Sequence, residues 1–149
     1  MNIQIRKVEP DSELVGKLLE FVLNSTWDEV KEHTAESIRN NTATDWEAMF
    51  VAMDGDRIVG HASIAKTDYY PLPEIYPWIS TAYVDEAYRG NGICGMLIGH
   101  INQYAQELGF DRTYIPSEFF GLYERYGYQY VKDIENYGGG IDHLFSKKI

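Results

Sequence analysis

The chain has 149 residues, a formal net charge of −10 and a hydrophobic content of 44%. This length fits a single domain spanning residues 1–149, and the apolar content excludes a disordered chain. The acidic balance, with no cluster of Lys and Arg, argues against binding to nucleic acid. It weakly favours a cationic partner such as an amine, because a negative field concentrates positive ligands.

The same sequence argues against secretion, membranes and metals. The first six residues alternate apolar and polar side chains and lack the continuous apolar stretch of a secretion signal. No segment approaches the ~20 apolar residues of a membrane span, so we expect a cytoplasmic protein. Cys94 is the only cysteine, which excludes an internal disulfide. The four histidines lack ligand spacing, so no metal is expected.

The first half of the chain predicts one strand, two helices and a hairpin. Residues 3–8 alternate as in a strand, and apolar residues recur at helical spacing from Leu14 to Val22. A more polar helix, expected on the surface, covers Asp28 to Arg39. Apolar runs at 50–53 and 58–64 flank Asp54-Gly55-Asp56-Arg57, which predicts a hairpin because Asp-Gly tolerates the positive φ of tight turns.

The second half predicts a loop followed by alternating strands and helices. The loop at 67–77 holds three prolines, and a strand follows at 78–84. An amphipathic helix runs from Ile93 to Leu108 and ends at Gly109. The remaining expected elements are strand 112–115, a short helix from Pro116-Ser117 through Tyr126, and strands 128–131 and 142–146. This order predicts a mixed sheet flanked by helices, an α/β (α+β) architecture.

The most informative segment is the glycine-rich turn between the strand at 78–84 and the helix that begins near Ile93. Gly90, Gly92 and Gly95 let the backbone curl so that its N–H groups converge, and the helix dipole adds positive potential. Such a turn can bind a diphosphate through main-chain amides, with Arg89 adding a charge-assisted contact. The alternative is a plain tight turn with Arg89 in solvent.

The three glycines also match G-x-G-x-x-G, the fingerprint of dinucleotide-binding proteins. Two features argue against an oxidoreductase of that type. The fingerprint should follow a strand directly, but residues 85–89 intervene here. It should also open repeated βαβ units, whereas a hairpin precedes it.

Two motifs resemble the GNAT superfamily of N-acetyltransferases. Residues 89–94 resemble the family's coenzyme A loop, R/Q-x-x-G-x-G/A; Arg89 and Gly92 match, and the small Cys94 stands where Gly or Ala is preferred. Residues 122–128, Leu-Tyr-Glu-Arg-Tyr-Gly-Tyr, resemble the signature F-Y-E-K-L-G-F. Pro77-Trp78 resembles a bacterial subgroup with Pro-Trp before the fourth strand. The two motifs occur in the family's order, and the resemblance covers nearly the whole chain.

This resemblance implies a GNAT fold, with a mostly antiparallel, twisted sheet of six to seven strands flanked by about four helices. It implies acetyl-CoA as cosubstrate and direct transfer of the acetyl group to a primary amine in a ternary complex. The acceptor is a small molecule or a protein, and a homodimer is left open. The implied coenzyme A contacts are Tyr83 and Val84 through their backbone, and the loop residues Arg89, Gly90, Asn91, Gly92, Ile93, Cys94 and Gly95.

The chemistry requires a proton donor for the departing thiolate and a base for the amine. The resemblance assigns the donor to Tyr123, whose phenol has a pKa of about 10 and is protonated at neutral pH. For the base we favour Glu74, in the loop that enters the strand at 78–84; Asp68, Glu118, His61 and a water chain are alternatives. The resemblance places the oxyanion donor among the amides of residues 82–84.

Two further alternatives stay open at this point. Cys94 lies at a helix N-terminus, which lowers a thiol pKa, but without a neighbouring His we expect a buried, inert thiol. The aromatic residues Tyr69, Tyr70, Tyr76 and Trp78 could hold an alkylammonium or form ordinary core. The second function class is a non-catalytic module that binds or senses acyl-CoA with the same fold.

Overall fold

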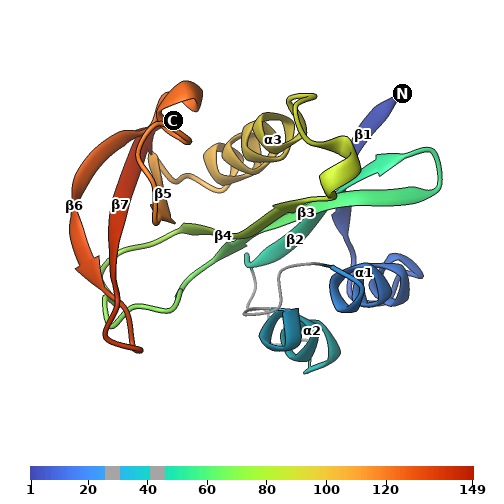
Figure 1. The fold of residues 1–149 in the computed structure, drawn as a ribbon, viewed down its shortest axis with the longest axis horizontal. Helices are drawn as coiled ribbons and strands as arrows, with labels where there is room; N and C mark the ends of the chain where they lie inside the picture. Colours follow the sequence, from blue (N-terminus) through green and yellow to red (C-terminus); the bar gives the residue numbers. More distant parts are fainter. Residues whose placement is uncertain (26–30, 41–45) are drawn as a thin grey trace. The chain divides into compact units, whose positions relative to one another are not determined.

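The computed structural model describes residues 1–25, 31–40 and 46–149. These residues divide into two compact units: unit 1 is Met1–Ser63 with Thr81–Ile98, and unit 2 is Ile64–Ser80 with Gly99–Ile149. The elements, drawn in Figure 1, are β1 Ile3–Val8, α1 Leu14–Leu23, α2 Lys31–Asn40, β2 Ala48–Asp54, β3 Arg57–Ala65, β4 Trp78–Val84, the 3₁₀ turn η1 Glu86–Tyr88, α3 Ile93–Glu107, β5 Arg112–Ser117, the 3₁₀ turn η2 Glu124–Tyr126, β6 Gln129–Glu135 and β7 Ile141–Lys148.

Hydrogen bonds join the strands in the order β1-β2-β3-β4-β5-β7-β6, in a mostly antiparallel sheet in which β4 and β5 run parallel. The predicted α/β (α+β) architecture with six to seven strands is therefore confirmed. The predicted hairpin is also present, since Gly55 takes a φ of +60° between β2 and β3. None of the described helices combines the length and the apolar character that crossing a membrane requires.

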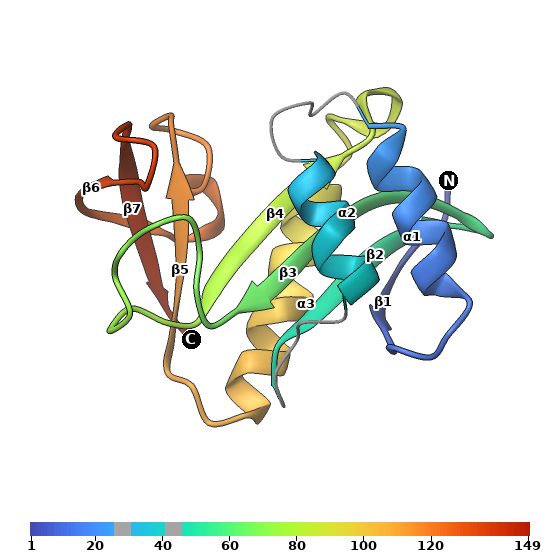
Figure 2. The same ribbon diagram turned by 90° about the horizontal axis from the view of Figure 1, so that it is seen from below.

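Unit 1 places helices on both faces of its strands. β1 pairs antiparallel with β2, with Ile3 opposite Asp54. α1 and α2 cover one face of these strands, and the first turns of α3 lie on the other (Figures 1 and 2). The core between the strands and α1–α2 consists of Leu18, Val22, Ala35, Val51, Met53 and Ile58.

The predicted surface position of the second helix is only half right. The start expected at Asp28 lies outside the described residues, and the described helix is α2. Thr34 and Ala35 are buried, while Glu32 and Glu36 are exposed. A small residue such as Ala35 lets the helix approach the core closely, so few apolar side chains are needed to bury one face of it.

Unit 2 contains an antiparallel ladder of β5, β7 and β6, which lie side by side in Figure 2. Arg112 of β5 pairs with Lys148 of β7, and the pairing continues to Ser117 opposite His143. The register of β6 against β7 shifts between Tyr130 and Lys132, which marks a bulge. One buried cluster of this unit consists of Tyr70, Trp78, Ile134 and Leu144.

The helix predicted from Pro116-Ser117 through Tyr126 is wrong. β5 continues through both of those residues, because β7 offers hydrogen-bonding partners to their backbone. The following turns are closed by side chains: Ser117 Oγ accepts from Phe119 N at 3.0 Å, and the Glu124 carboxylate accepts from Gly121 N at 2.7 Å. These bonds compete with helical ones, so only η2 forms.

Candidate functional site

The glycine-rich turn of unit 1 connects β4 to α3 through η1. Asp85 caps η1, since its carboxylate accepts a hydrogen bond from Ala87 N at 3.0 Å. Gly90 and Gly92 then take φ values of +83° and +76°, in the left-handed region that side-chain-bearing residues avoid. α3 begins directly after Gly92, whose carbonyl accepts from Met96 N at 3.1 Å. The sequence therefore predicted both the turn and the start of the helix.

The outer side of this turn is open. Residues 90–92 are exposed, and a Cβ added at Gly90 or Gly92 would meet no atom within 4 Å. The first turn of any α-helix has N–H groups without intrahelical acceptors, and the helix dipole makes that end positive. Two glycines with positive φ, open space above them and a helix N-terminus fit a diphosphate group.

Side chains from the β2–β3 hairpin hold the beginning of this turn. Arg57 Nη2 lies 3.4 Å from the Asp85 carboxylate, and the Tyr88 hydroxyl donates to Asp54 at 2.9 Å. The Arg57 guanidinium also lies 5.6 Å from the centre of the Tyr88 ring. The hydrogen bond to Asp54 raises the pKa of Tyr88. Sequence reasoning used Asp54 and Arg57 only as turn residues and missed this second role, since no local pattern pairs them with 85–88.

Two side chains of the turn bond to its own carbonyls. Asn91 Nδ2 donates to the carbonyl of Tyr88 at 2.9 Å and, more weakly, to that of Arg89 at 3.4 Å. Arg89 Nε donates to the carbonyl of Val84 at 2.9 Å. The amide side chain of Asn91 thus satisfies carbonyl groups and stabilises the curled backbone.

Strand β4 contains a backbone irregularity that sequence reasoning did not find. Thr81 has a φ of +54°, which is rare for a β-branched residue and costs of order 1–3 kcal/mol. Its hydroxyl lies 3.2 Å from Ser63 Oγ, and its backbone hydrogen-bonds His61. Contacts from β3 therefore hold Thr81 in this conformation, just before the strand residues 82–84.

His61 itself is buried, with 2% of its surface exposed, and it packs in an aromatic group. Its ring is nearly parallel to that of Tyr83 at 5.9 Å, and Phe21 contacts it edge-on at 5.9 Å. Burial lowers the pKa of His61 to about 4, and its Nδ1 has no hydrogen-bond partner within the described part of the chain. A base this weak is poorly suited to deprotonate an ammonium whose pKa is near 10.4.

β3 approaches the end of β4 so closely at position 60 that a side chain there would crowd its neighbours. A Cβ at Gly60 would lie 3.0 Å from the backbone oxygen of Tyr83 and 3.4 Å from Val84 Cγ2. We expect Gly60→Ala to destabilise the protein by about 1–3 kcal/mol, because the backbone just before the turn must shift. Urea unfolding at equilibrium measures this loss.

Gly99→Ala is the matched control for that substitution. A Cβ at Gly99 meets nothing within 4 Å, and the residue lies inside α3, where Ala is favoured over Gly by about 1 kcal/mol. The control should therefore be as stable as the native chain or more stable. Equal stability of Gly60→Ala and the native chain would show that β3 and β4 are not this closely packed.

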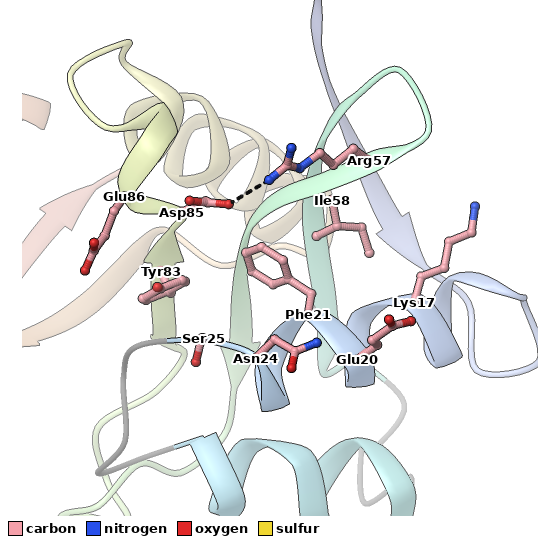
Figure 3. Close-up of a pocket in the computed structure, with 10 residues that line it drawn as sticks. All are labelled: Lys17, Glu20, Phe21, Asn24, Ser25, Arg57, Ile58, Tyr83, Asp85 and Glu86. Atoms are coloured by element: carbon pink, nitrogen blue, oxygen red, sulfur yellow. Dashed lines mark hydrogen bonds and ion pairs between the residues drawn. The ribbon is translucent and has the colours of Figure 1, made fainter.

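A cavity of about 530 Å³ lies in unit 1 beside the residues that precede the turn (Figure 3). Helix α1 and β3 form part of its wall, and Tyr83, Asp85 and Glu86 complete it. Its charges are mixed, and Figure 3 shows Arg57 directed at Asp85. The full lining is Lys17, Glu20, Phe21, Asn24, Ser25, Arg57, Ile58, Tyr83, Asp85 and Glu86.

In unit 2, Tyr123 lies immediately before η2 and is partly buried. Its carbonyl accepts from Tyr126 N at 2.9 Å, and its ring contacts Tyr128 edge-on at 6.5 Å. Tyr128 is itself fixed, because its buried hydroxyl lies 2.7 Å from Thr113 Oγ1 and 3.1 Å from Asn102 Nδ2. The Tyr123 ring thus packs against a rigid neighbour. Its role as acid stays a prediction.

The candidate bases of unit 2 have different surroundings. Glu74 lies in an exposed turn of the loop before β4. Asp68 accepts a hydrogen bond from Ser80 Oγ at 2.5 Å and another from Tyr69 N at 2.7 Å. Glu118 is exposed just after β5. Glu74 is therefore the more accessible of the two loop carboxylates and stays the predicted base.

The four aromatic residues around the loop at 67–77 separate into core and surface. Tyr70 stacks on Trp78 at 5.4 Å, and both are buried. Burial, together with a 2.7 Å hydrogen bond to Asp142, raises the pKa of Tyr70. Tyr69 and Tyr76 are 57% and 45% exposed. Tyr70 and Trp78 therefore belong to the core, whereas Tyr69 and Tyr76 are exposed enough to contact a ligand.

Cys94 is partly exposed in the first turn of α3, whereas the sequence predicted a buried thiol. Because it belongs to the proposed coenzyme A loop, acetyl-CoA should shield it from alkylation. At ten times the dissociation constant about one tenth of the molecules remain free, so labelling by iodoacetamide should slow about tenfold. Mass spectrometry of timed samples, with S-acetylpantetheine as a ligand that lacks the diphosphate, measures this effect. An unchanged labelling rate would place acetyl-CoA away from Cys94.

No candidate metal site appears in the described ranges 1–25, 31–40 and 46–149, where no three His, Cys, Asp or Glu side chains form a suitable group. The residues predicted for the site are main-chain amides of the turn, the Arg89 guanidinium and the Tyr123 phenol. This donor set suits an anionic carrier and proton transfer.

Solved structures share the fold of this chain. Curated protein sequences gave no significant match. Among solved structures, an aminoglycoside 6'-acetyltransferase type Ii superimposes with a TM-score of 0.75 at 19% identity, covering 97% of this chain and 96% of that one. The aminoglycoside 6'-N-acetyltransferase from Enterococcus faecium gives 0.73 at 18% identity with the same coverage. A GNAT family acetyltransferase from Elizabethkingia anophelis with acetyl-CoA bound gives 0.65 at 16% identity, covering 99% of each chain.

These identities are low, so the superpositions show the fold and nothing finer. The sequence model of the Acetyltransferase (GNAT) family matches residues 16–128, more than half of the chain. That match includes the glycine-rich turn and the segment that contains Tyr123. The chain therefore belongs to the GNAT family of acetyltransferases.

Proposed function

We propose that this protein transfers the acetyl group of acetyl-CoA to a primary amine by direct attack in a ternary complex. The observation that carries the proposal is the open turn at 89–95, where two glycines with positive φ lead into α3. The loop residues Arg89, Gly90, Asn91, Gly92, Ile93, Cys94 and Gly95 would hold the diphosphate. The backbone of Tyr83 and Val84 would hydrogen-bond the pantetheine arm.

Tyr123 is proposed as the acid that protonates the departing thiolate, and Glu74 as the base that takes the proton of the amine. Support for Tyr123 comes from its motif and from a ring held by Tyr128. Support for Glu74 is its exposure in the loop before β4. The ammonium form of the acceptor loses one proton to Glu74, and the neutral amine nitrogen then forms the amide bond and releases its second proton to solvent. As the thioester bond breaks, the thiolate gains a proton from Tyr123, which is reprotonated from solvent, so the reaction releases one proton overall.

The acceptor is proposed to be a cationic amine. The net charge of −10 concentrates cations near the protein. Three of the similar structures carry the name aminoglycoside acetyltransferase, so aminoglycosides belong in the first substrate panel together with polyamines, amino acids and lysine peptides.

The test is to incubate the native chain with acetyl-CoA and each amine and to measure free coenzyme A thiol. A protein blank corrects for Cys94, and mass spectrometry identifies the acetylated amine. Turnover with at least one primary amine is expected. Binding of acetyl-CoA without acetylation of any amine would favour a non-catalytic acyl-CoA sensor, and failure to bind acetyl-CoA would contradict both functions.

A further inference from the structure

The ring of Tyr83, at the end of β4, lies at the centre of a side-chain cluster in unit 1. The residue is only 9% exposed. The Arg89 guanidinium carbon lies 5.4 Å from the ring centre, within the range of a cation–π contact. His61 and Phe21 fix the same ring, the first nearly parallel at 5.9 Å and the second edge-on at 6.0 Å.

Arg89 is an exposed side chain that is nevertheless held at two points. Its Nε donates to the carbonyl of Val84 at 2.9 Å, and its guanidinium carbon lies over the Tyr83 ring. A guanidinium is planar and has five N–H donors, so the bond from Nε uses one and leaves the four on the terminal nitrogens. Fixing Nε and one face of the plane also fixes the directions of those four.

The neighbouring groups favour this arrangement. Burial lowers the pKa of His61 to about 4, so at neutral pH the imidazole beside Tyr83 carries no charge that would repel Arg89. Asp85, four residues before Arg89, interacts with Arg57 and with the amide of Ala87. Within the described ranges, the contacts given for the Arg89 guanidinium group are the face of the Tyr83 ring and the carbonyl of Val84.

We propose that Tyr83 is a positioning residue, whose buried ring holds the Arg89 guanidinium ready for the diphosphate of acetyl-CoA before the ligand arrives. This inference rests on the proposed function of the turn at 89–95 and adds the side chain of Tyr83 to it. Pre-organisation of this kind improves binding because the ordering of a flexible side chain is already complete in the free protein.

The experiment compares Tyr83→Leu, which removes the π face, with Tyr83→Phe, which keeps it. For Tyr83→Leu we expect KM for acetyl-CoA to rise about five- to tenfold, the range of a partly exposed cation–π contact, with kcat within about twofold. Tyr83→Phe should restore most of the affinity. With S-acetylpantetheine, which lacks the diphosphate, the KM values of Tyr83→Leu and Tyr83→Phe should differ much less than they do with acetyl-CoA, whereas a general disturbance of the site would raise KM for both substrates alike.

Arg89→Gln provides a second test through a double-mutant cycle. If Tyr83 acts through Arg89, Tyr83→Leu should have little further effect on KM in the Arg89→Gln background. Full additivity of the two effects would overturn the proposal. If Tyr83→Leu does not fold, Arg89→Lys is measured in its place. Lysine keeps the positive charge but lacks the planar guanidinium, so positioning of the guanidinium predicts a rise in KM for acetyl-CoA. An unchanged KM would show that only the charge matters.

Isothermal titration with acetyl-CoA separates failure of this inference from failure of the proposed function, since it requires no acceptor. If the native chain does not bind acetyl-CoA, the proposed function fails. If the native chain and Tyr83→Leu bind it equally, only the positioning role fails. The expected result is a dissociation constant five- to tenfold higher for Tyr83→Leu than for the native chain and Tyr83→Phe.

Discussion

Tyr123→Phe should lower kcat about a hundredfold and leave the fold intact. The substitution removes only the hydroxyl, and general acid catalysis by one side chain contributes a factor of about 100 or more. A phenol with a pKa of about 10 stays protonated at neutral pH and can pass its proton to a thiolate whose conjugate acid has a pKa near 8.5. The measurement is kcat at saturating acetyl-CoA and amine across pH 6–10.

The structure explains why this variant should fold. The Tyr123 carbonyl, which accepts from Tyr126 N, and the ring contact with Tyr128 both survive the change to Phe. Tyr126→Phe is the matched control, since it removes a hydroxyl from the same 3₁₀ turn without touching the proposed acid. Turnover of Tyr123→Phe equal to that of the native chain would remove Tyr123 from the mechanism.

The native chain should lose about 3 kcal/mol of stability between pH 6.5 and pH 4 because of His61 alone. Burial lowers the pKa of His61 from 6.5 to about 4. Between these two values, the His61 imidazole is protonated in the unfolded chain and neutral in the folded chain. The contribution of His61 to the free energy of unfolding is therefore complete above pH 6.5 and is lost as the pH falls toward 4. A difference of about 2.5 pKa units corresponds to about 3 kcal/mol.

Urea unfolding of the native chain and of His61→Phe at several pH values isolates this effect. The carboxylates titrate in both proteins, so only the difference between the two curves reports on His61. That difference should change by about 3 kcal/mol between pH 7 and pH 4. His100→Gln, at an exposed position in α3, should follow the native curve. Parallel curves for the native chain and His61→Phe would show that His61 is not a buried neutral imidazole.

Much of the local structure could be predicted because short-range chemistry decides it. Asp54-Gly55 gave the hairpin turn, where Gly55 takes a positive φ without steric cost. The apolar spacing from Ile93 and the glycine at 109 gave both ends of α3, where Gly109 has a φ of +97°. Gly90 and Gly92 likewise adopt a positive φ because glycine has no side chain to oppose it.

The errors lie where partners far apart in the sequence compete with local preference. Pro116 and Ser117 predict the start of a helix, but their backbone pairs with β7 and continues strand β5. Only the 3₁₀ turn η2 forms where the helix is predicted. Cys94 was expected to be buried, and its partial exposure depends on how the surrounding elements cover the first turn of α3. Spacing within a segment carries no information about such coverage.

The sequence by itself determined the order of the elements from β1 to β5, the glycine turn before α3 and the two family motifs, because each depends on residues within a few positions of one another. Only the tertiary structure decided that Thr81 adopts a positive φ, that Gly60 must approach the Tyr83 carbonyl, and that Arg89 lies over the Tyr83 ring. Each of these depends on packing and hydrogen bonds formed after the chain has folded back on itself, and no local propensity favours them.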